Sequence, residues 1–311
     1  MPSSTSPSTA KWVSLAAIDV GSNAIRMIVG QAHGHQIHIL HRLRSPVRLG
    51  KDVFHTGLIG PETMSAAVDT FVKFAKIMRE SAVRRYRAVA TSATREAKNG
   101  ATFIEVLRQK SGIQVEIIDG LEEAKLIHTA IRHEVRLDNA FVAGIDVGGG
   151  SIEVTFSENG KITATRSFPL GTVRLLEILE KRKMSEKDLG VILGEHIGTL
   201  TNFIEQETHG LPVDFAVGTG GNLDCMMKLK GQLLGREGMS YITLQELGTI
   251  SDMLAKLSVR ERQQKLKLKP DRADVIYPAT LLVKTFLGLV CSEKLIIPRV
   301  GVREGILWSL F

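Results

Sequence analysis

The sequence has few cysteines and no long uninterrupted apolar segment. Of its 311 residues only Cys225 and Cys291 are cysteines, far apart and without a CxxC motif. This excludes a disulfide-stabilised scaffold, and sparse cysteine is typical of a reducing cytoplasm. The longest apolar stretch, 279–291, is interrupted by Lys284 and is too short to cross a bilayer. We therefore expect a cytoplasmic protein with no membrane partner.

The start of the chain also lacks the apolar core of a secretory signal, and its Ser, Thr and Pro residues predict a disordered lead-in over 1–12. The full sequence is 43% hydrophobic and 23% charged, which is enough apolar surface for a packed core. Its length suggests two domains. The formal net charge of +7 is a weak indication of an anionic partner, and a merely basic solvated surface explains it equally well.

An internal repeat indicates the domain organisation. IDVGSNAI at 18–25 recurs as IDVGGGSI at 145–152, which places Asp146 127 positions after Asp19. Each copy reads as an apolar strand ending in Asp, a glycine turn and a second strand. Chance similarity of two buried strands is the alternative, which the matching context disfavours. We predict an α/β protein with domains at 13–138 and 139–311, and both Asp residues facing a cleft between them.

Apolar periodicity and turn residues predict the other elements. We expect strands at 15–20, 24–29, 88–90, 113–118 and 213–217, and helices at 102–109, 121–135, 185–208, 244–257 and 273–289, with another long helix opening at Gly60-Pro61. The residues 91–93 are expected to form a loop.

Two glycine-rich loops indicate phosphate binding. Gly148-Gly149-Gly150-Ser151 follows a strand, and successive glycines let backbone N–H groups approach an anion closely. Gly218-Thr219-Gly220-Gly221 joins a strand to a helix, whose N terminus adds N–H donors and partial positive charge. Neither a Walker sequence nor the dinucleotide fingerprint fits the first loop. Purely structural turns are the alternative for both loops.

Several acidic and basic side chains accompany these loops. Asp146 and Glu153 flank the first turn, where their carboxylates can converge as hard ligands for Mg²⁺. Glu122 and Glu123 begin a helix, where they either complement its dipole or act in catalysis. Arg95 follows a strand end, where it either holds a phosphate or is a solvated helix-start residue.

Two further clusters are interpreted as non-functional. The histidines at 33, 35, 38 and 41 lack Cys or carboxylate partners at ligand spacing, so we expect no metal there. The basic run from Arg260 to Arg272 is interpreted as a solvated face rather than a polyanion track, and no nucleic-acid partner is expected.

Seven motifs together resemble a known family. IDVGSNAIRMIVG, ATSATREA, IDGLEEAKLIHTAI, GIDVGGGSIEV, VGTGGN, PDRADVIYPATLLV and VREGIL, spanning Ala16 to Leu307, are similar to the exopolyphosphatase/guanosine-pentaphosphate phosphohydrolase family of the actin–Hsp70–sugar kinase superfamily. The resemblance implies two tandem ribonuclease H-like (actin-like ATPase) domains with an interdomain cleft. It also implies a cytoplasmic homodimer that removes terminal orthophosphate from polyphosphate or guanosine pentaphosphate with Mg²⁺, or Mn²⁺ in its place.

The resemblance also implies roles for individual residues. Glu123 would be the general base that activates water, with Glu122 kept as the alternative, and Asp146 and Glu153 would hold the metal. The phosphate-binding set would be Asp19, Ser22, Asn23, Arg95, Gly148, Gly149, Gly150, Ser151, Gly218, Thr219, Gly220 and Gly221.

The sequence departs from the family pattern in two respects. It ends at Phe311 without the extra C-terminal domains of long members, so we expect a reduced preference for long polymers. Ser151-Ile152 stands where the family usually has Ser-Thr, which removes one hydroxyl from the phosphate cradle. A kinase of the same superfamily and a non-catalytic polyphosphate or nucleotide binder remain the alternative functions.

Overall fold

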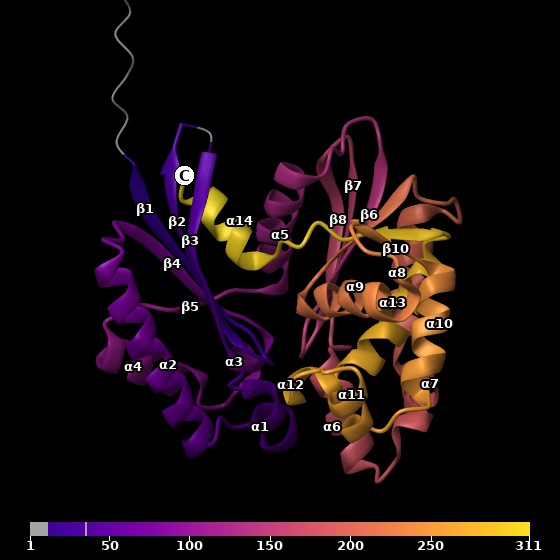
Figure 1. Cartoon of the computed structure of the whole chain (residues 1–311), viewed down its shortest axis with the longest axis horizontal. Helices are drawn as coiled ribbons and strands as arrows, with labels where there is room; N and C mark the ends of the chain where they lie inside the picture. Colours follow the sequence, from indigo (N-terminus) through magenta and orange to yellow (C-terminus); the bar gives the residue numbers. More distant parts are fainter. Residues whose placement is uncertain (1–11, 35) are drawn as a thin grey trace, which may run out of the picture.

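The structure is a computed structural model that describes residues 12–34 and 36–311 (Figure 1). Two α/β halves lie side by side, each built around its own twisted sheet. The strand order is β3-β2-β1-β4-β5 in the first half and β10-β11-β9-β6-β7-β8 in the second. The lead-in predicted at 1–12 lies, apart from Trp12, outside the described residues.

The first half begins with the antiparallel strands β1 (Val13–Val20), β2 (Ile25–His33) and β3 (Gln36–Ser45). Strands β4 (Arg85–Ala90) and β5 (Glu116–Ile117) continue the sheet in parallel. Nearly every residue of β1 is buried, as expected for a central strand covered on both faces. The helices are α1 (Leu49–Thr56), α2 (Pro61–Glu80), α3 (Ser92–Glu96), α4 (Gly100–Ser111) and α5 (Gly120–Glu134).

The second half repeats this plan and enlarges it. Strands β6 (Phe141–Val147), β7 (Ile152–Glu158) and β8 (Lys161–Phe168) form an antiparallel meander, and β9 (Phe215–Thr219) pairs in parallel with β6. Strands β11 (Lys294–Ile296) and β10 (Tyr241–Thr243) complete the sheet. The helices are α6 (Thr172–Lys181), the 3₁₀ turn η1 (Glu186–Asp188), α7 (Leu189–His196), α8 (Gly198–Thr208), α9 (Gly221–Leu234), α10 (Leu244–Ala255), α11 (Val259–Lys265), α12 (Pro270–Ala273), α13 (Ile276–Leu289) and α14 (Val302–Ser309).

The internal repeat is present in the strand pairing as well as in the sequence. In each half the Asp-bearing strand pairs antiparallel with the next strand and parallel with a later one. A bulge interrupts the following pair at Val29/Gly30 and again at Phe156/Ser157. Since bulges are specific local features of a strand pair, their recurrence 127 positions later shows that the two hairpins share one design.

The C-terminal helix α14 returns to the first half after β11 (Figure 1). It packs against α5 and β1, and Gly305 lies so close to the Leu126 carbonyl that a side chain there would collide with the α5 backbone. The Trp308 ring stacks on His133 with ring centroids 3.7 Å apart. A mixed apolar cluster from β1, α5, β6 and α14 therefore joins the two halves at this side of the molecule.

Three predictions about elements were wrong. The expected loop at 91–93 contains the first turn of α3, which begins at Ser92. The single helix predicted over 185–208 is three pieces, because glycines at 190, 194 and 198 weaken it and the chain turns near Ile197. The strand predicted at 113–118 pairs only over Glu116–Ile117. Within the described residues no helix combines the length and apolar character that spanning a membrane requires.

Candidate active site

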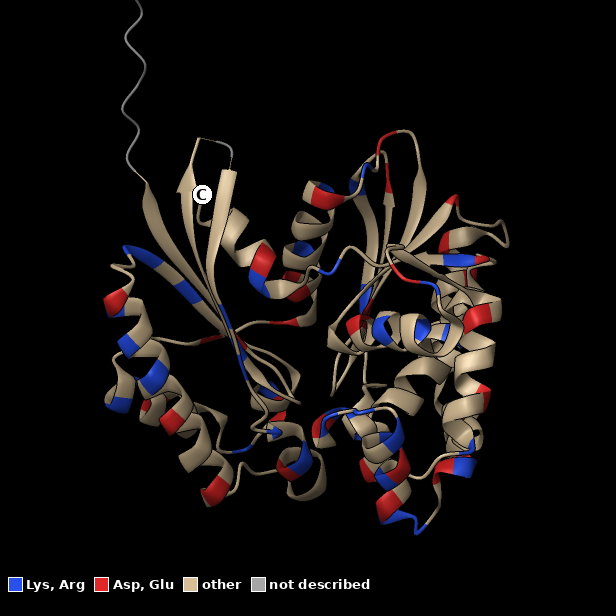
Figure 2. Ribbon diagram, viewed as in Figure 1, with Lys and Arg blue, Asp and Glu red and all other residues tan. Residues whose placement is uncertain are grey.

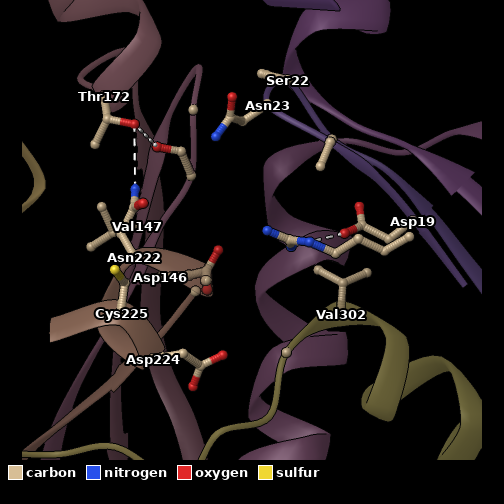
Figure 3. Close-up of a pocket in the computed structure, with 18 of the residues that line it drawn as sticks. Asp19, Ser22, Asn23, Asp146, Val147, Thr172, Asn222, Asp224, Cys225 and Val302 are labelled. Carbon is tan, nitrogen blue, oxygen red and sulfur yellow. Dashed lines mark hydrogen bonds and ion pairs between the residues drawn. The ribbon is translucent and has the colours of Figure 1, made fainter. Parts of the chain in front are cut away.

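A cavity of about 400 Å³ lies between the two halves, where β1, β6 and the start of α9 meet (Figure 3). Both Asp residues of the sequence repeat, Asp19 and Asp146, line it from opposite sides. The other predicted site residues that line it are Ser22, Asn23, Glu123, Gly148, Gly149, Gly150, Ser151, Gly220 and Gly221. The cavity thus brings together segments that are far apart in the sequence.

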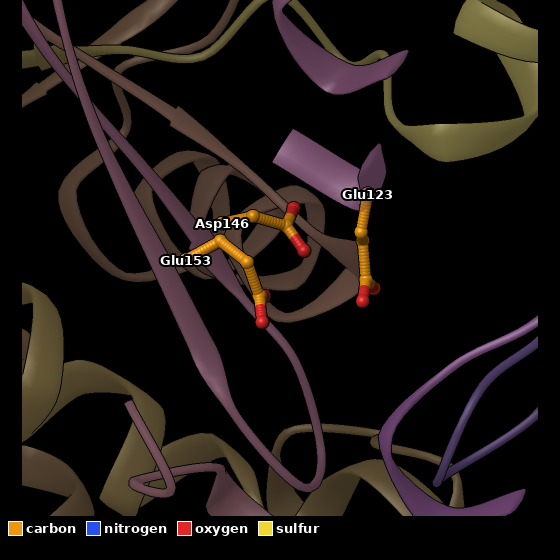
Figure 4. Close-up of side chains that lie close together, drawn as sticks. All are labelled: Glu123, Asp146 and Glu153. Carbon is orange, nitrogen blue, oxygen red and sulfur yellow. The ribbon is translucent and has the colours of Figure 1, made fainter. Parts of the chain in front are cut away.

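Three carboxylates converge beside this cavity, of which Glu123 and Asp146 line it and Glu153 does not. Glu123, Asp146 and Glu153 each offer an oxygen atom, and these oxygens lie within 4.8 Å of one another (Figure 4). Asp146 and Glu153 are direct cross-strand partners on β6 and β7, so the hairpin register itself places their side chains together. Glu123 comes from the first turn of α5, which Asp119 caps by accepting the Glu122 N–H at 2.8 Å.

Hydrogen bonds fix two of these carboxylates and leave specific oxygens free. The hydroxyls of Ser151 and Ser167 both donate to Glu153 Oε1 at 2.7 Å. The Thr219 hydroxyl donates to Asp146 Oδ1. Among the residues that the structure describes, the buried Oε2 atoms of Glu123 and Glu153 have no hydrogen-bond partner. Buried oxygens without a donor are costly unless a cation or water binds them, so the donor set fits a hard divalent metal ion.

Burial raises the pKa of all three carboxyls. The pKa of Glu123 lies well above its usual value because of burial and of the nearby Glu153 and Asp146 charges, against which Arg95 acts. Burial and Asp146 raise the pKa of Glu153 to about 7, although the two serine hydroxyls act in the opposite direction. Burial likewise raises the pKa of Asp146. A bound cation would relieve this repulsion.

The two adjacent glutamates at the start of α5 point in different directions. Glu123 is buried and lines the cavity. Glu122 is half-buried and pairs with Arg87, outside the cavity lining. The structure therefore separates two candidates that the sequence could not distinguish.

The first glycine loop is held close to the first half of the molecule. The Gly148 N–H donates to the Ser151 carbonyl at 3.1 Å, so Gly148 closes the turn rather than offering this N–H to the cavity. A side chain at Gly149 would lie 3.1 Å from Ser22 Cβ, and one at Gly150 would lie 2.5 Å from Phe54 Cζ. Glycine is needed here because the two halves approach each other across the loop.

The second glycine loop divides into two functions. Gly218 lies inside β9, where a side chain would collide with Leu295 from β11, so its small size serves packing, and it does not line the cavity. Gly220 has φ 108°, in the region that favours glycine, and Gly221 begins α9 beside the Arg26 and Arg272 guanidinium groups. Only the latter two glycines, with the start of α9, face the cavity.

Arg95 does not line the cavity. Its Nη1 donates to the Ile118 carbonyl at 2.7 Å, and its charge acts on Glu123 and Glu153 through space, lowering the pKa of both. The sequence predicted that Arg95 contacts a phosphate directly, but in the structure its side chain lies outside the cavity lining.

Comparison with known proteins agrees with this geometry. The model of the Ppx/GppA phosphatase family matches residues 27–311. The chain belongs to the Ppx/GppA phosphatase family. Exopolyphosphatase 2 of Mycobacterium tuberculosis is 27% identical, over 93% of this chain and 94% of that protein. The guanosine-5'-triphosphate,3'-diphosphate pyrophosphatase of Aliivibrio fischeri is 25% identical over 95% of this chain, which spans only 59% of that relative.

Solved structures of the Ppx/GppA family share the fold. An exopolyphosphatase from Cytophaga hutchinsonii is 26% identical and superposes with a TM-score of 0.86, over 96% of this chain and 97% of that one. The Aquifex aeolicus family member, also 26% identical, gives a TM-score of 0.76 over 96% and 98% of the two chains. The predicted α/β fold with two tandem domains is thereby confirmed.

Sequence reasoning missed most of the basic groups in this Ppx/GppA site. Eight Lys and Arg side chains line the cavity, namely Arg26, Arg44, Lys228, Lys267, Lys269, Arg272, Arg299 and Arg303. Burial and neighbouring arginines lower the pKa of Arg272 to about 10, which marks a strongly positive environment. An available signal was the charge of Arg26 inside an otherwise apolar strand, because a buried strand accepts an arginine only where it has an anionic partner.

The basic run at 260–272 is not a solvated face throughout, so that interpretation was wrong. Lys267, Lys269 and Arg272 line the cavity from the connection between α11 and α12 and from α12 itself. Figure 2 shows Lys and Arg in blue along the ribbon around α11 and α12. Arg262 is fully buried and donates to Glu186, to the Leu254 carbonyl and to the Ala273 carbonyl. Arg262 thus anchors the segment that carries three basic side chains into the cavity.

Proposed function

We propose that this chain is a metal-dependent phosphoanhydride hydrolase that releases terminal orthophosphate from inorganic polyphosphate or guanosine pentaphosphate. The observation that carries the proposal is the acidic triad Glu123, Asp146 and Glu153, two of whose members, Glu123 and Asp146, line a cavity that eight basic side chains and two glycine loops also line. Such a cavity binds a polyanion together with one cation, which is what phosphoanhydride cleavage requires. The names of the Mycobacterium and Aliivibrio relatives support the same substrates.

In this proposal Glu123 is the general base. Its raised pKa makes this carboxylate a stronger proton acceptor than an ordinary glutamate, as a general base requires. Its free Oε2 atom is available for that water. The neighbouring Glu122 is committed to Arg87 and has no such position.

Asp146 and Glu153 would hold Mg²⁺, or Mn²⁺ in its place, with Ser151, Ser167 and Thr219 orienting them. When bound, the cation neutralises phosphate oxygens and polarises the bond to be broken. The chain's own residues do the rest of the binding. Backbone N–H groups of Gly149, Gly150, Gly220 and Gly221, with Ser22 and Asn23, would contact the phosphates.

The first half would contribute mainly positive charge. Asp19 pairs with Arg26 at 3.3 Å and so aims this guanidinium at the cavity, while Arg95 supports the triad from outside the cavity. We further infer that 13–138 and 139–311 act as two domains whose approach excludes bulk water, with α14 returning to the first. The homodimer and the cytoplasmic location stay predictions.

The direct test measures orthophosphate release from tripolyphosphate, long-chain polyphosphate and guanosine pentaphosphate, each with Mg²⁺ and with a chelator. We expect release that depends on the cation and needs no acceptor molecule. Phosphate transfer only in the presence of a sugar acceptor would favour a superfamily kinase instead. Tight binding with an unchanged polymer ladder would favour a non-catalytic binder.

A further inference from the structure

Asp224 is an acidic side chain that faces the basic cavity without a partner. It lies in the first turn of α9 and lines the cavity together with Lys228 from the next turn. Figure 3 shows its carboxylate directed away from α9 into the open space. Within 12–34 and 36–311, this carboxylate takes part in no side-chain hydrogen bond and no ion pair. It is therefore free to accept hydrogen bonds from a ligand.

The other acidic residues that line the cavity have partners or belong to the triad. Asp19 pairs with Arg26, and Glu123 and Asp146 converge with Glu153. Asp224 feels the positive charges of Arg26, Arg272, Arg299 and Arg303, yet none of them lies within 4.0 Å of it. A negative charge in the first turn stabilises helix α9. The same charge repels any phosphate bound at this N terminus. A cavity built only for phosphates gains nothing from this carboxylate.

The walls near Asp224 are partly apolar. Cys225 follows it on α9, and Leu268, Val300 and Val302 line the cavity from two other segments. Figure 3 shows Val302 across the open space from Asp224 and Cys225. Apolar side chains offer no donors to phosphate oxygens, but they can pack against a sugar or a base. The cavity lining thus offers a nucleoside apolar contacts in addition to the acceptor oxygens of Asp224.

Helix geometry places this region beyond the glycine loop. Gly221, Asp224 and Lys228 lie on one face of α9, and with a rise of about 1.5 Å per residue Asp224 is roughly one turn from the loop. A ligand whose terminal phosphate lies at the triad and whose next phosphates contact the loop would then bring its following group to Asp224.

We propose that Asp224 is a specificity-determining residue, whose carboxylate accepts hydrogen bonds from the neutral N–H and O–H donors of a nucleoside and repels the additional phosphates of a long polymer. The inference rests on the proposed phosphoanhydride hydrolysis and selects, between its two substrate classes, the nucleoside polyphosphate. Carboxylates bind such donors in pairs, as at ribose hydroxyls, whereas two negative groups at contact distance repel.

The test compares the wild-type chain with Asp224→Asn, which keeps the side-chain shape and removes the charge. The matched control is Asp252→Asn, an exposed aspartate on α10 outside the cavity lining. One arm measures kcat/KM for guanosine pentaphosphate and for long-chain polyphosphate with Mg²⁺. A second arm measures the Kd of guanosine tetraphosphate and of tripolyphosphate by calorimetry in the presence of a chelator.

We expect Asp224→Asn to weaken the guanosine ligands about tenfold and to strengthen long-chain polyphosphate about tenfold, with tripolyphosphate, which ends before Asp224, little changed, while Asp252→Asn changes none of these ligands. Parallel changes for the two ligand classes, or no change, would overturn the proposal. If the wild-type chain hydrolyses none of these substrates, the proposed function fails. The binding arm then still decides whether Asp224 discriminates between the two ligand classes.

Discussion

Equivalent positions in the two sheets carry opposite chemistry. Each half has one row of four residues that are neighbours across the strands. In the first half the row is Val89, Asp19, Arg26 and Arg44. In the second half it is Thr219, Asp146, Glu153 and Ser167. The backbone pairing is the same, and only the side chains differ.

The difference shows how one repeated hairpin serves two purposes. In the first half Arg26 and Arg44 follow Asp19, so the row carries net positive charge. In the second half Glu153 stands where Arg26 would be, and hydroxyls from Thr219 and Ser167 support the carboxylates. A basic row and an acidic row thus meet at one cavity, an arrangement that fits the proposed binding of a phosphate chain together with a metal ion.

The largest expected effect comes from Glu123, whose carboxylate converges with Asp146 and Glu153 of the second row. Glu123→Gln removes the base while keeping the side-chain shape, so kcat for phosphate release should fall about 10²- to 10⁴-fold with little change in KM. Steady-state kinetics on tripolyphosphate measure this. Glu122→Gln is the matched control and should stay near wild-type activity, because Glu122 lies outside the cavity lining and pairs with Arg87. Equal losses in both variants would remove Glu123 from its proposed role.

A second pair of variants tests the opposite character of the rows directly. Asp146→Asn should weaken Mg²⁺ binding at least about tenfold, since it removes one of the proposed ligands. Asp19→Asn should leave Mg²⁺ binding near wild type, because Asp19 pairs with Arg26 instead. Calorimetric titration of each variant with Mg²⁺ is the measurement. The comparison breaks down if the two substitutions reduce metal affinity by similar factors.

The hairpins and their acidic residues were predictable because the relevant information is local. The apolar strands, the glycine turns and the 127-residue offset all lie within short segments. The turn of the second hairpin places Asp146 opposite Glu153 through strand register alone, so their convergence followed from sequence. Glu123 was recognised through family resemblance, and only the fold shows that it points inward while Glu122 points outward.

The basic lining was not predictable in the same way because it depends on long-range placement. Arg44 lies at the end of β3, and Arg303 lies on a helix that crosses back to the first half. Lys267 reaches the cavity because Arg262 buries its guanidinium and anchors the chain at that point. Sequence alone shows a run of charges there, and the usual outcome for such a run is a solvated face.

When no cation is bound, the buried carboxyl of Glu153 in the second row should make the protein less stable as the pH rises. The folded-state pKa of Glu153, about 7, is raised above its ordinary value of 4.5. A raised pKa means that the stabilising contribution is fully present below about pH 4.5 and is lost as the pH rises through 7. In chelator, Tm should therefore fall by roughly 5 °C between pH 5 and pH 8.

Two additional measurements sharpen this expectation. Glu153→Gln should make the fall in Tm smaller, because its amide does not titrate, while the raised pKa values of Glu123 and Asp146 leave part of the fall in place. Mg²⁺ should raise Tm of the wild-type chain more at pH 8 than at pH 5, since protons compete with the cation for the same oxygens. A wild-type profile in chelator that rises from pH 5 to pH 8 would contradict the assignment of a raised pKa to Glu153.

The smallest expected effect comes from the hydroxyls that support the acidic row. Ser167→Ala removes one of two hydrogen bonds to Glu153 Oε1, which raises the pKa of this carboxyl further and loosens its orientation. Mg²⁺ affinity should fall about three- to tenfold, because Ser151 still donates to the same oxygen. Thr165→Ala is the matched control on β8, where the hydroxyl bonds to Thr155 and not to the triad. If both variants bind Mg²⁺ equally well, the serine hydroxyl is a packing feature of the hairpin, and the two rows differ only in their charged residues.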